Sequence, residues 1–312
     1  MSSFVEINGF NCRYEYNTNI HARETIVFIN GIASPLESWN IVKAPFEDRY
    51  NTLVYDMRGQ WSSETTDDKP YSFLGMADDL LQLTEKLGIE NAHIVGTSLG
   101  GEIALWFALL YPQKAKSLSV LASVSEADEL MCLRVDRWRR VASEALEALD
   151  ISNDCPKVFQ KAADNFHDVF VPDIFSNNFL SKEYQSLEQR KLGVRENIHR
   201  GVYKGHINLT LMFYKLKAEE KLTPRLHEIH CPTLVVGAEF DAVKPASFSE
   251  LIASKIPNAK LHILKDTGHA VLLERPAEIV ALLNGFISAN KKVNQVMYDH
   301  VNIYCEDKNN FN

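Results

Sequence analysis

Short apolar runs alternate with amphipathic stretches through the first 123 residues of the chain. Runs bounded by turn-forming residues predict strands, whereas apolar residues at helical spacing, as between Ser72 and Gly88, predict helices. Asn8-Gly9 is typical of a tight hairpin. The expected strands are Phe4–Ile7, Cys12–Tyr16, Thr25–Asn30, Asn51–Tyr55, Ala92–Gly96 and Ser117–Ser123, and the expected helices are Phe73–Leu87 and Glu102–Tyr111. Such alternation predicts an α/β fold, with a mostly parallel sheet flanked by helices.

The alternation stops from about Ser125 to Leu222, where only helical patterns occur. Strands resume near Thr233 and at Leu261–Leu264. We therefore expect about a hundred residues of helix inserted within the order of the sheet, although these helices could instead simply extend the core. The expected helices are Leu130–Leu149, Pro156–Val169, Lys182–Leu192 and Asn208–Glu220.

The segment Gly96-Thr97-Ser98-Leu99-Gly100 lies where a predicted buried strand meets a predicted helix. A Gly-x-Ser-x-Gly turn in this position exposes the serine hydroxyl on a strained backbone, and the glycines allow the strand and helix to pack closely. This pattern predicts that Ser98 is a nucleophile. The alternative is a glycine-rich turn whose serine only caps the helix.

A nucleophilic serine needs a base and a group that orients the base. In this architecture the partners follow the serine in the order acid, then histidine. Asp241 and His269 each follow a predicted strand, as Ser98 does, so all three should meet at one edge of the sheet. Glu239 is an alternative acid, and Asp266 is interpreted as a loop residue. His93 is expected to be a packed core residue.

Several segments together resemble the α/β-hydrolase fold superfamily, in its group of serine esterases, lactonases and C–C hydrolases. They extend from about residue 25 to residue 285, with a poorly matching middle. The segments are Phe28-Ile29-Asn30-Gly31, Asp56-Met57-Arg58-Gly59, Gly96 to Gly101, Pro232 to Gly237 with Asp241, and Gly268-His269 with Glu274-Arg275-Pro276.

The resemblance implies a role for each site residue. Ser98 would be the nucleophile, His269 the general base and later acid, and Asp241 the residue that fixes the imidazole. The backbone N–H groups of Ile32 and Leu99 would form the oxyanion hole, where each donor is typically worth ~10² to 10³ in rate. No cofactor is implied.

The resemblance also implies a domain organisation and shows two departures from the family pattern. Residues 1–124 and 223–289 would form the hydrolase core, 125–222 a helical cap over the serine, and 290–312 a polar tail. Asn30 stands where the family usually has histidine, which affects the oxyanion loop. Trp61 stands where it commonly has glycine, and so narrows the pocket mouth or packs on the surface.

Composition excludes several classes of protein. At 312 residues and 46% hydrophobic, the chain can bury a substantial core, and no apolar run approaches the ~20 residues of a membrane span. A net charge of −8 argues against a nucleic-acid partner. His227, His230 and Cys231 are interpreted as structural, so no metal site is expected. Five scattered cysteines and the absence of a secretory pattern at the start predict a cytoplasmic location.

The sequence thus predicts a serine hydrolase that cleaves a small, partly apolar ester, lactone or related carbonyl substrate through an acyl-enzyme. C–C bond hydrolysis, thioester hydrolysis and acyl transfer use the same triad and stay open as alternatives. A ligand-binding or receptor protein that retains the fold is the alternative from another class. The oligomeric state and the substrate itself are beyond what the sequence predicts.

Overall fold

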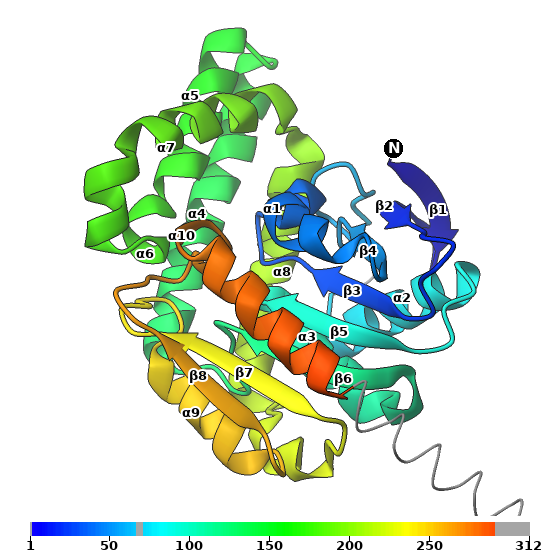
Figure 1. The fold of residues 1–312 in the computed structure, drawn as a ribbon. Helices are drawn as coiled ribbons and strands as arrows, with labels where there is room; N and C mark the ends of the chain where they lie inside the picture. The colour runs from blue at the N-terminus through cyan, green and yellow to red at the C-terminus, as the bar shows by residue number, and fades with distance from the viewer. Residues whose placement is uncertain (1, 67–70, 291–312) are drawn as a thin grey trace, which may run out of the picture.

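The structure, a computed structural model, describes residues 2–66 and 71–290, and a β-sheet lies at the centre of this part of the chain. The eight strands are β1 (Ser3–Ile7), β2 (Phe10–Asn17), β3 (Thr25–Ile29), β4 (Asn51–Tyr55), β5 (Ala92–Thr97), β6 (Ala115–Leu121), β7 (Thr233–Ala238) and β8 (Lys260–Leu264). They follow the order β1-β2-β4-β3-β5-β6-β7-β8 (Figure 1). β1 and β2 pair antiparallel, as do β2 and β4, whereas the pairings from β4 through β8 are parallel. The prediction of a mostly parallel sheet is confirmed.

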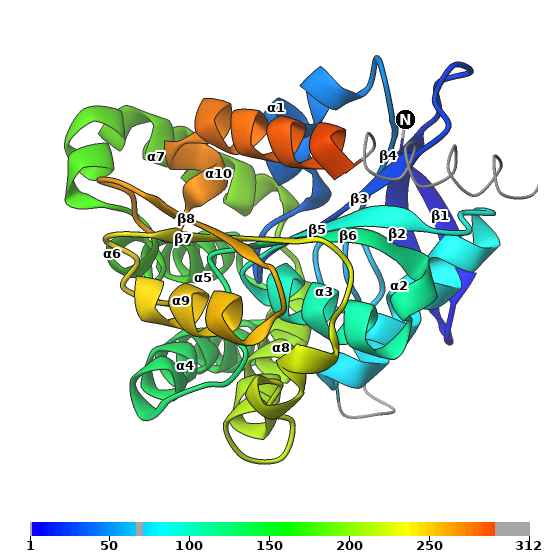
Figure 2. The same cartoon turned by 60° about the horizontal axis from the view of Figure 1, so that its bottom comes forward.

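Helices cover both faces of this sheet (Figure 2). One face carries α2 (Phe73–Lys86), α3 (Leu99–Leu110) and α9 (Ala246–Lys255); the other carries α1 (Asn40–Lys43), α10 (Val271–Glu274) and a helix over residues 276–290. Because both faces are buried, the central strands are continuous apolar runs. In β3, Val27 packs into the core on one face and Phe28 into the core on the other.

Five helices lie between β6 and β7 in the chain, and we call residues 125–222 the insertion. They are α4 (Glu129–Ser152), α5 (Pro156–Asp168), α6 (Val171–Ile174), α7 (Asn177–Asn197) and α8 (Arg200–Ala218). In Figure 1 they are drawn in green beyond the carboxyl ends of the parallel strands. The amide of Leu222 donates to the carbonyl of Ser125 (2.8 Å), so the two ends of the insertion meet. That the insertion is a separate cap domain stays a prediction.

Short 3₁₀ helices complete the connections. They are η1 (Leu36–Trp39), η2 (Ala44–Phe46), η3 (Pro112–Lys114) and η4 (Thr223–Glu228). The predicted hairpin between β1 and β2 is present, and Asn8 and Gly9 both have positive φ, 43° and 79°. Within the described residues no helix is long and apolar enough to cross a membrane. The predicted tail, 290–312, lies outside the described residues except for residue 290.

Helix boundaries in the insertion differ from the sequence predictions. α7 extends well beyond Lys182–Leu192, and α8 begins eight residues before the predicted start at Asn208. The reason is local capping: the Ser176 hydroxyl accepts from the amide of Phe179, and the His199 ring accepts from the amide of Gly201. Capping groups start these helices where the apolar pattern is weak.

Candidate active site

Ser98 lies on the turn that joins β5 to α3. Its backbone angles, φ 52° and ψ −121°, are ones that a non-glycine residue rarely adopts. The turn is tight: a Cβ added to Gly96 would lie 2.1 Å from the carbonyl oxygen of Gly100, so no side chain fits at 96. The local sequence therefore explains both the strain and the position of the serine at the end of β5. α3 begins at Leu99, immediately after the turn, rather than at the predicted Glu102.

The structure brings Ser98, His269 and Asp241 together. The Nε2 atom of His269 lies 2.9 Å from Ser98 Oγ, and its Nδ1 atom lies 2.7 Å from Asp241 Oδ2. The other carboxylate oxygen of Asp241 accepts from the amides of Val243 (2.9 Å) and Lys244 (2.7 Å). All three side chains are buried. An imidazole held between a hydroxyl and a carboxylate in this way has the geometry to take the serine proton.

The alternative residues lie elsewhere. Glu239 is exposed, forms an ion pair with Lys265 (3.2 Å) and accepts from the amide of Asp266 (3.1 Å). Asp266 itself is a turn residue with φ 49°. His93 is buried in the sheet, where its Nδ1 lies 2.8 Å from Ser117 Oγ. Neither competing carboxylate contacts His269.

The residues considered for a metal site lie away from these three side chains. His227 and His230 are exposed. Burial raises the pKa of the Cys231 thiol to about 11, which disfavours the thiolate that a metal would need. In the described part of the chain no three His, Cys, Asp or Glu side chains are grouped as metal ligands.

The loop after β3 passes directly beside Ser98. A Cβ added to Gly31 would lie 3.2 Å from the Cβ of Ser98, so the backbone at Gly31 passes beside the nucleophile. The next residue, Ile32, lines the cavity described below. The amides of Ile32 and Leu99 make no hydrogen bond to another described residue. Their role as oxyanion donors stays a prediction.

Two side chains hold this loop in place. Asn30 is the residue that departs from the family pattern. Its side-chain amide, through Nδ2, donates to the backbone carbonyls of Ser34 and Tyr55 (both 3.1 Å). Gln60 accepts from the amide of Ala33 (2.5 Å) and donates to the carbonyl of Gly31 (3.3 Å). Asn30 therefore ties the loop to the end of β4 without a histidine. Sequence reasoning missed Gln60, because only the fold brings it beside the loop.

Trp61, the second departure, lies where the core meets the insertion. Its side chain is buried and lines the cavity, and its carbonyl accepts from His199 Nε2 (2.7 Å). Trp61 thus forms part of the cavity wall and contacts the start of α8.

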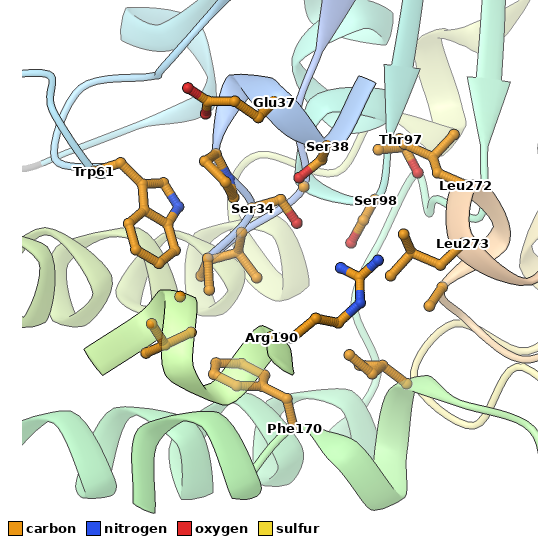
Figure 3. A pocket seen from close by; sticks show the side chains of 18 of the residues that line it. Ser34, Glu37, Ser38, Trp61, Thr97, Ser98, Phe170, Arg190, Leu272 and Leu273 are labelled. Atoms are coloured by element: carbon orange, nitrogen blue, oxygen red, sulfur yellow. The ribbon is translucent and has the colours of Figure 1, made fainter. Parts of the chain in front are cut away.

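Ser98 opens into a cavity of about 870 Å³ between the edge of the sheet and the insertion (Figure 3). Much of its wall is apolar, and includes Phe170 and Ile174 from the insertion and Leu272 and Leu273 from α10. The volume lies in the range of small-molecule sites. The charged or titratable side chains in the lining are Arg13, Glu37, His167, Arg190 and His269.

Comparison with known proteins identifies the family of the chain. Residues 24–276 match the family model described as the alpha/beta hydrolase fold. The chain belongs to the alpha/beta hydrolase fold family. It is therefore an enzyme of this fold, as its curated relatives are named as hydrolases.

Relatives of this hydrolase-fold chain differ in the substrates they are named for. This chain is 26% identical over 268 residues to a protein named putative carbamate hydrolase RutD from Caulobacter sp. (strain K31). The match covers 85% of this chain and 91% of that protein. The chain is 25% identical over 264 residues to 3-oxoadipate enol-lactonase 1 from Acinetobacter baylyi, covering 85% and 88%. The solved structure of MGS-M2, an alpha/beta hydrolase enzyme from a Medee basin deep-sea metagenome library, matches with a TM-score of 0.79 at 26% identity, covering 92% and 97%.

A buried ion pair lies behind the active site of this hydrolase-fold enzyme. Lys244 Nζ lies 2.7 and 2.9 Å from the two carboxylate oxygens of Glu102, and both side chains are at most 1% exposed. Glu102 also accepts from the hydroxyl of Ser123 and the amide of Val124. The pair joins α3 to the loop that carries Asp241. Sequence reasoning missed it, although an acidic residue within the otherwise apolar α3 is a visible signal.

Proposed function

We propose that this protein is a serine hydrolase that cleaves a small ester, lactone or related carbonyl substrate. The observation that carries the proposal is His269, hydrogen-bonded to Ser98 on one side and to Asp241 on the other, at the base of a partly apolar cavity. The substrate class is consistent with the relatives, one of which is named an enol-lactonase.

The reaction would proceed through an acyl-enzyme. Ser98 Oγ attacks the carbonyl carbon while His269 Nε2 takes its proton, and Asp241 stabilises the resulting imidazolium. The amides of Ile32 and Leu99 donate to the oxyanion. The intermediate collapses as His269 returns the proton to the leaving group. Water activated by the same imidazole then releases the acid and restores the serine.

The insertion acts in this proposal as a cap, residues 125–222, on a core of 1–124 and 223–289. Support comes from the cavity wall, to which α4, α5, α6 and α7 contribute while the sheet edge supplies Ser98. A cover of this kind excludes water and shapes the substrate pocket. The partner is a small molecule, since a net charge of −8 disfavours nucleic acid.

A cytoplasmic location is also part of the proposal. It rests on the four cysteines in the described residues, Cys12, Cys132, Cys155 and Cys231, which are all free thiols. Free thiols are typical of a reducing compartment.

A labelling experiment tests the proposed nucleophile. A fluorophosphonate should label the protein, and a panel of ethyl and 4-nitrophenyl esters and lactones should include substrates. The Ser98→Ala variant should lose labelling and about 10⁶ in turnover, because the nucleophile is gone. Ser38→Ala, which changes another serine of the cavity lining, is the matched control and should retain both. Equal turnover by the Ser98→Ala variant and the parent would refute the mechanism.

A further inference from the structure

Arg190 is the charged group in the cavity lining that has no partner among the described residues. It lies on α7, and Figure 3 shows its guanidinium extending into the cavity on the side of Ser98 and Leu273. No hydrogen bond or ion pair joins this guanidinium to any described residue. Arg190 as a residue is exposed to solvent, and partial burial of its guanidinium lowers its pKa, with no acidic neighbour to offset that effect. The group stays charged, as arginine does in proteins.

The other charged or titratable side chains of the lining have partners. Arg13 forms ion pairs with Glu37 and with Asp56 (3.2 Å), which accounts for both the cation and the acid at that side of the cavity. His167 Nδ1 lies 2.9 Å from Asp168 Oδ1. His269 is bonded to Ser98 and Asp241 as described.

Arginines elsewhere in the insertion are also paired. Arg137 contacts Asp173, and Arg195, on the same helix as Arg190, contacts both oxygens of Asp164. Arg200 contacts Asp150 and Asp154. A planar guanidinium can bind a carboxylate through two parallel hydrogen bonds, and Arg195 binds Asp164 in this way. Arg190 differs from these arginines because it lines the cavity and no described acidic side chain pairs with it.

We propose that Arg190 binds a carboxylate of the substrate, so that the enzyme acts on monoanionic acids whose ester, lactone or related carbonyl group lies a few bonds from that carboxylate. This inference rests on the proposed function of Ser98. One uncompensated cation matches one negative charge, which favours a carboxylate over a phosphate dianion. The fork also orients the substrate, because two hydrogen bonds fix the plane of the carboxylate relative to the carbonyl that Ser98 attacks.

The net charge of the whole chain does not attract an anionic substrate. A net charge of −8 repels an anionic substrate at long range, although salt screens this repulsion beyond about 8 to 10 Å. Within the cavity, the lining contributes Arg190 as its unpaired charge. We therefore expect binding of the monoanion to depend on this residue rather than on general attraction.

Paired substrates test the proposal. Monoethyl succinate, monoethyl glutarate and monoethyl adipate are compared with ethyl butyrate, ethyl pentanoate and ethyl hexanoate, by titrating released acid. The parent protein should favour the monoanions at one chain length or more. Arg190→Gln should lower the ratio of kcat/KM between monoanion and neutral ester by roughly tenfold to a hundredfold, mainly through KM. Arg190→Lys should recover part of the ratio, since a lysine keeps the charge without the fork.

Lys182→Gln is the matched control, since it removes one charge from the same helix at an exposed residue outside the cavity. It should leave the ratio unchanged. A parent that prefers neutral esters, or an Arg190→Gln variant that slows both classes equally, would overturn the proposal and leave the hydrolase function standing. A parent that cleaves neither class and takes no fluorophosphonate label would overturn the hydrolase function.

A binding measurement is independent of turnover. The Ser98→Ala protein is titrated with each monoethyl ester in a calorimeter, and the double variant Ser98→Ala/Arg190→Gln is titrated in the same way. The single variant should bind at least one monoester, with a Kd roughly tenfold or more below that of the double variant. Equal affinities, or no binding to the single variant, would contradict the carboxylate site.

Discussion

At the scale of single residues, His206 on α8 is unusual because neither ring nitrogen has a hydrogen-bond partner among the described residues. The ring is buried against Phe166 and Phe170, with centroids 5.0 and 5.5 Å away. Burial lowers the pKa of His206 to about 3. The folded protein therefore keeps this imidazole neutral through the range in which an unfolded chain protonates it.

This difference predicts that acid destabilises the protein through His206. In the unfolded chain the imidazole takes up a proton near pH 6.5, whereas in the folded chain it does so only near pH 3. Because the unfolded state binds more protons between these values, the free energy of unfolding falls as the pH drops through that window, by at most about 1.4 kcal/mol per pH unit. Urea unfolding of the parent and of His206→Leu at pH 7, 6, 5 and 4.5 measures the free energy of unfolding at each pH. The variant should lose less stability, and parallel pH curves would contradict the prediction.

At the scale of elements, the Glu102–Lys244 pair fixes the relative position of α3 and the loop after β7. The amide of Lys244 donates to Asp241, so the pair acts on the orientation of the acid through the backbone. Burial lowers the pKa of Lys244, opposed by the attraction of Glu102. The two charges are therefore tolerated only together.

A double-mutant cycle tests this dependence. Lys244→Met leaves the Glu102 carboxylate buried without a cation, and should lower the free energy of unfolding by about 3 to 5 kcal/mol. Glu102→Gln/Lys244→Met removes both charges and should recover most of that loss. Urea denaturation of the parent, of Glu102→Gln, of Lys244→Met and of the double variant gives the coupling free energy between the two charges. If the two single losses simply add, the charges act independently and the interpretation fails.

α8 packs closely against the core loop around Gly59. A Cβ added to Gly205 would lie 1.8 Å from the carbonyl oxygen of Gly59. Gly59 has φ +75°, so its own backbone favours glycine as well. The two glycines therefore set how closely the insertion approaches the sheet.

The substitution Gly205→Ala separates packing from helix propensity. Propensity alone would stabilise a helix by about 1 kcal/mol, but the clash with Gly59 should dominate and lower the free energy of unfolding by about 1 to 3 kcal/mol. Gly285→Ala is the control, because that helical position has no atom within 4 Å of an added Cβ, and it should gain up to about 1 kcal/mol. Thermal or urea unfolding gives the stability of the parent and of both variants. A Gly205→Ala variant more stable than the parent would show that the contact with Gly59 has room for a methyl group.

At the scale of the whole molecule, the sequence predicts what depends on local pattern. Ser98, Asp241 and His269 each follow a strand within a few residues, so the edge at which they meet follows from the parallel sheet. Arg190 and Lys244 could not be found in this way. The role of Arg190 depends on which face of α7 lines the cavity, and the role of Lys244 depends on which element packs against the loop after β7. The hydrophobic periodicity of these segments predicts neither. The boundaries of α7 and α8 were missed because single capping residues decide them.

The meeting of the two ends of the insertion has a consequence for how such enzymes diversify. The side chains of Ser125 and Thr223 share a hydrogen bond of 2.7 Å, and β6 pairs with β7 directly below them. One contiguous stretch of gene thus encodes much of the wall that a substrate meets, while the reacting groups are encoded outside it. We expect that exchange of this one stretch would change selectivity while the reacting groups keep their place, and relatives of this chain are named as a carbamate hydrolase, an enol-lactonase and a monoacylglycerol lipase.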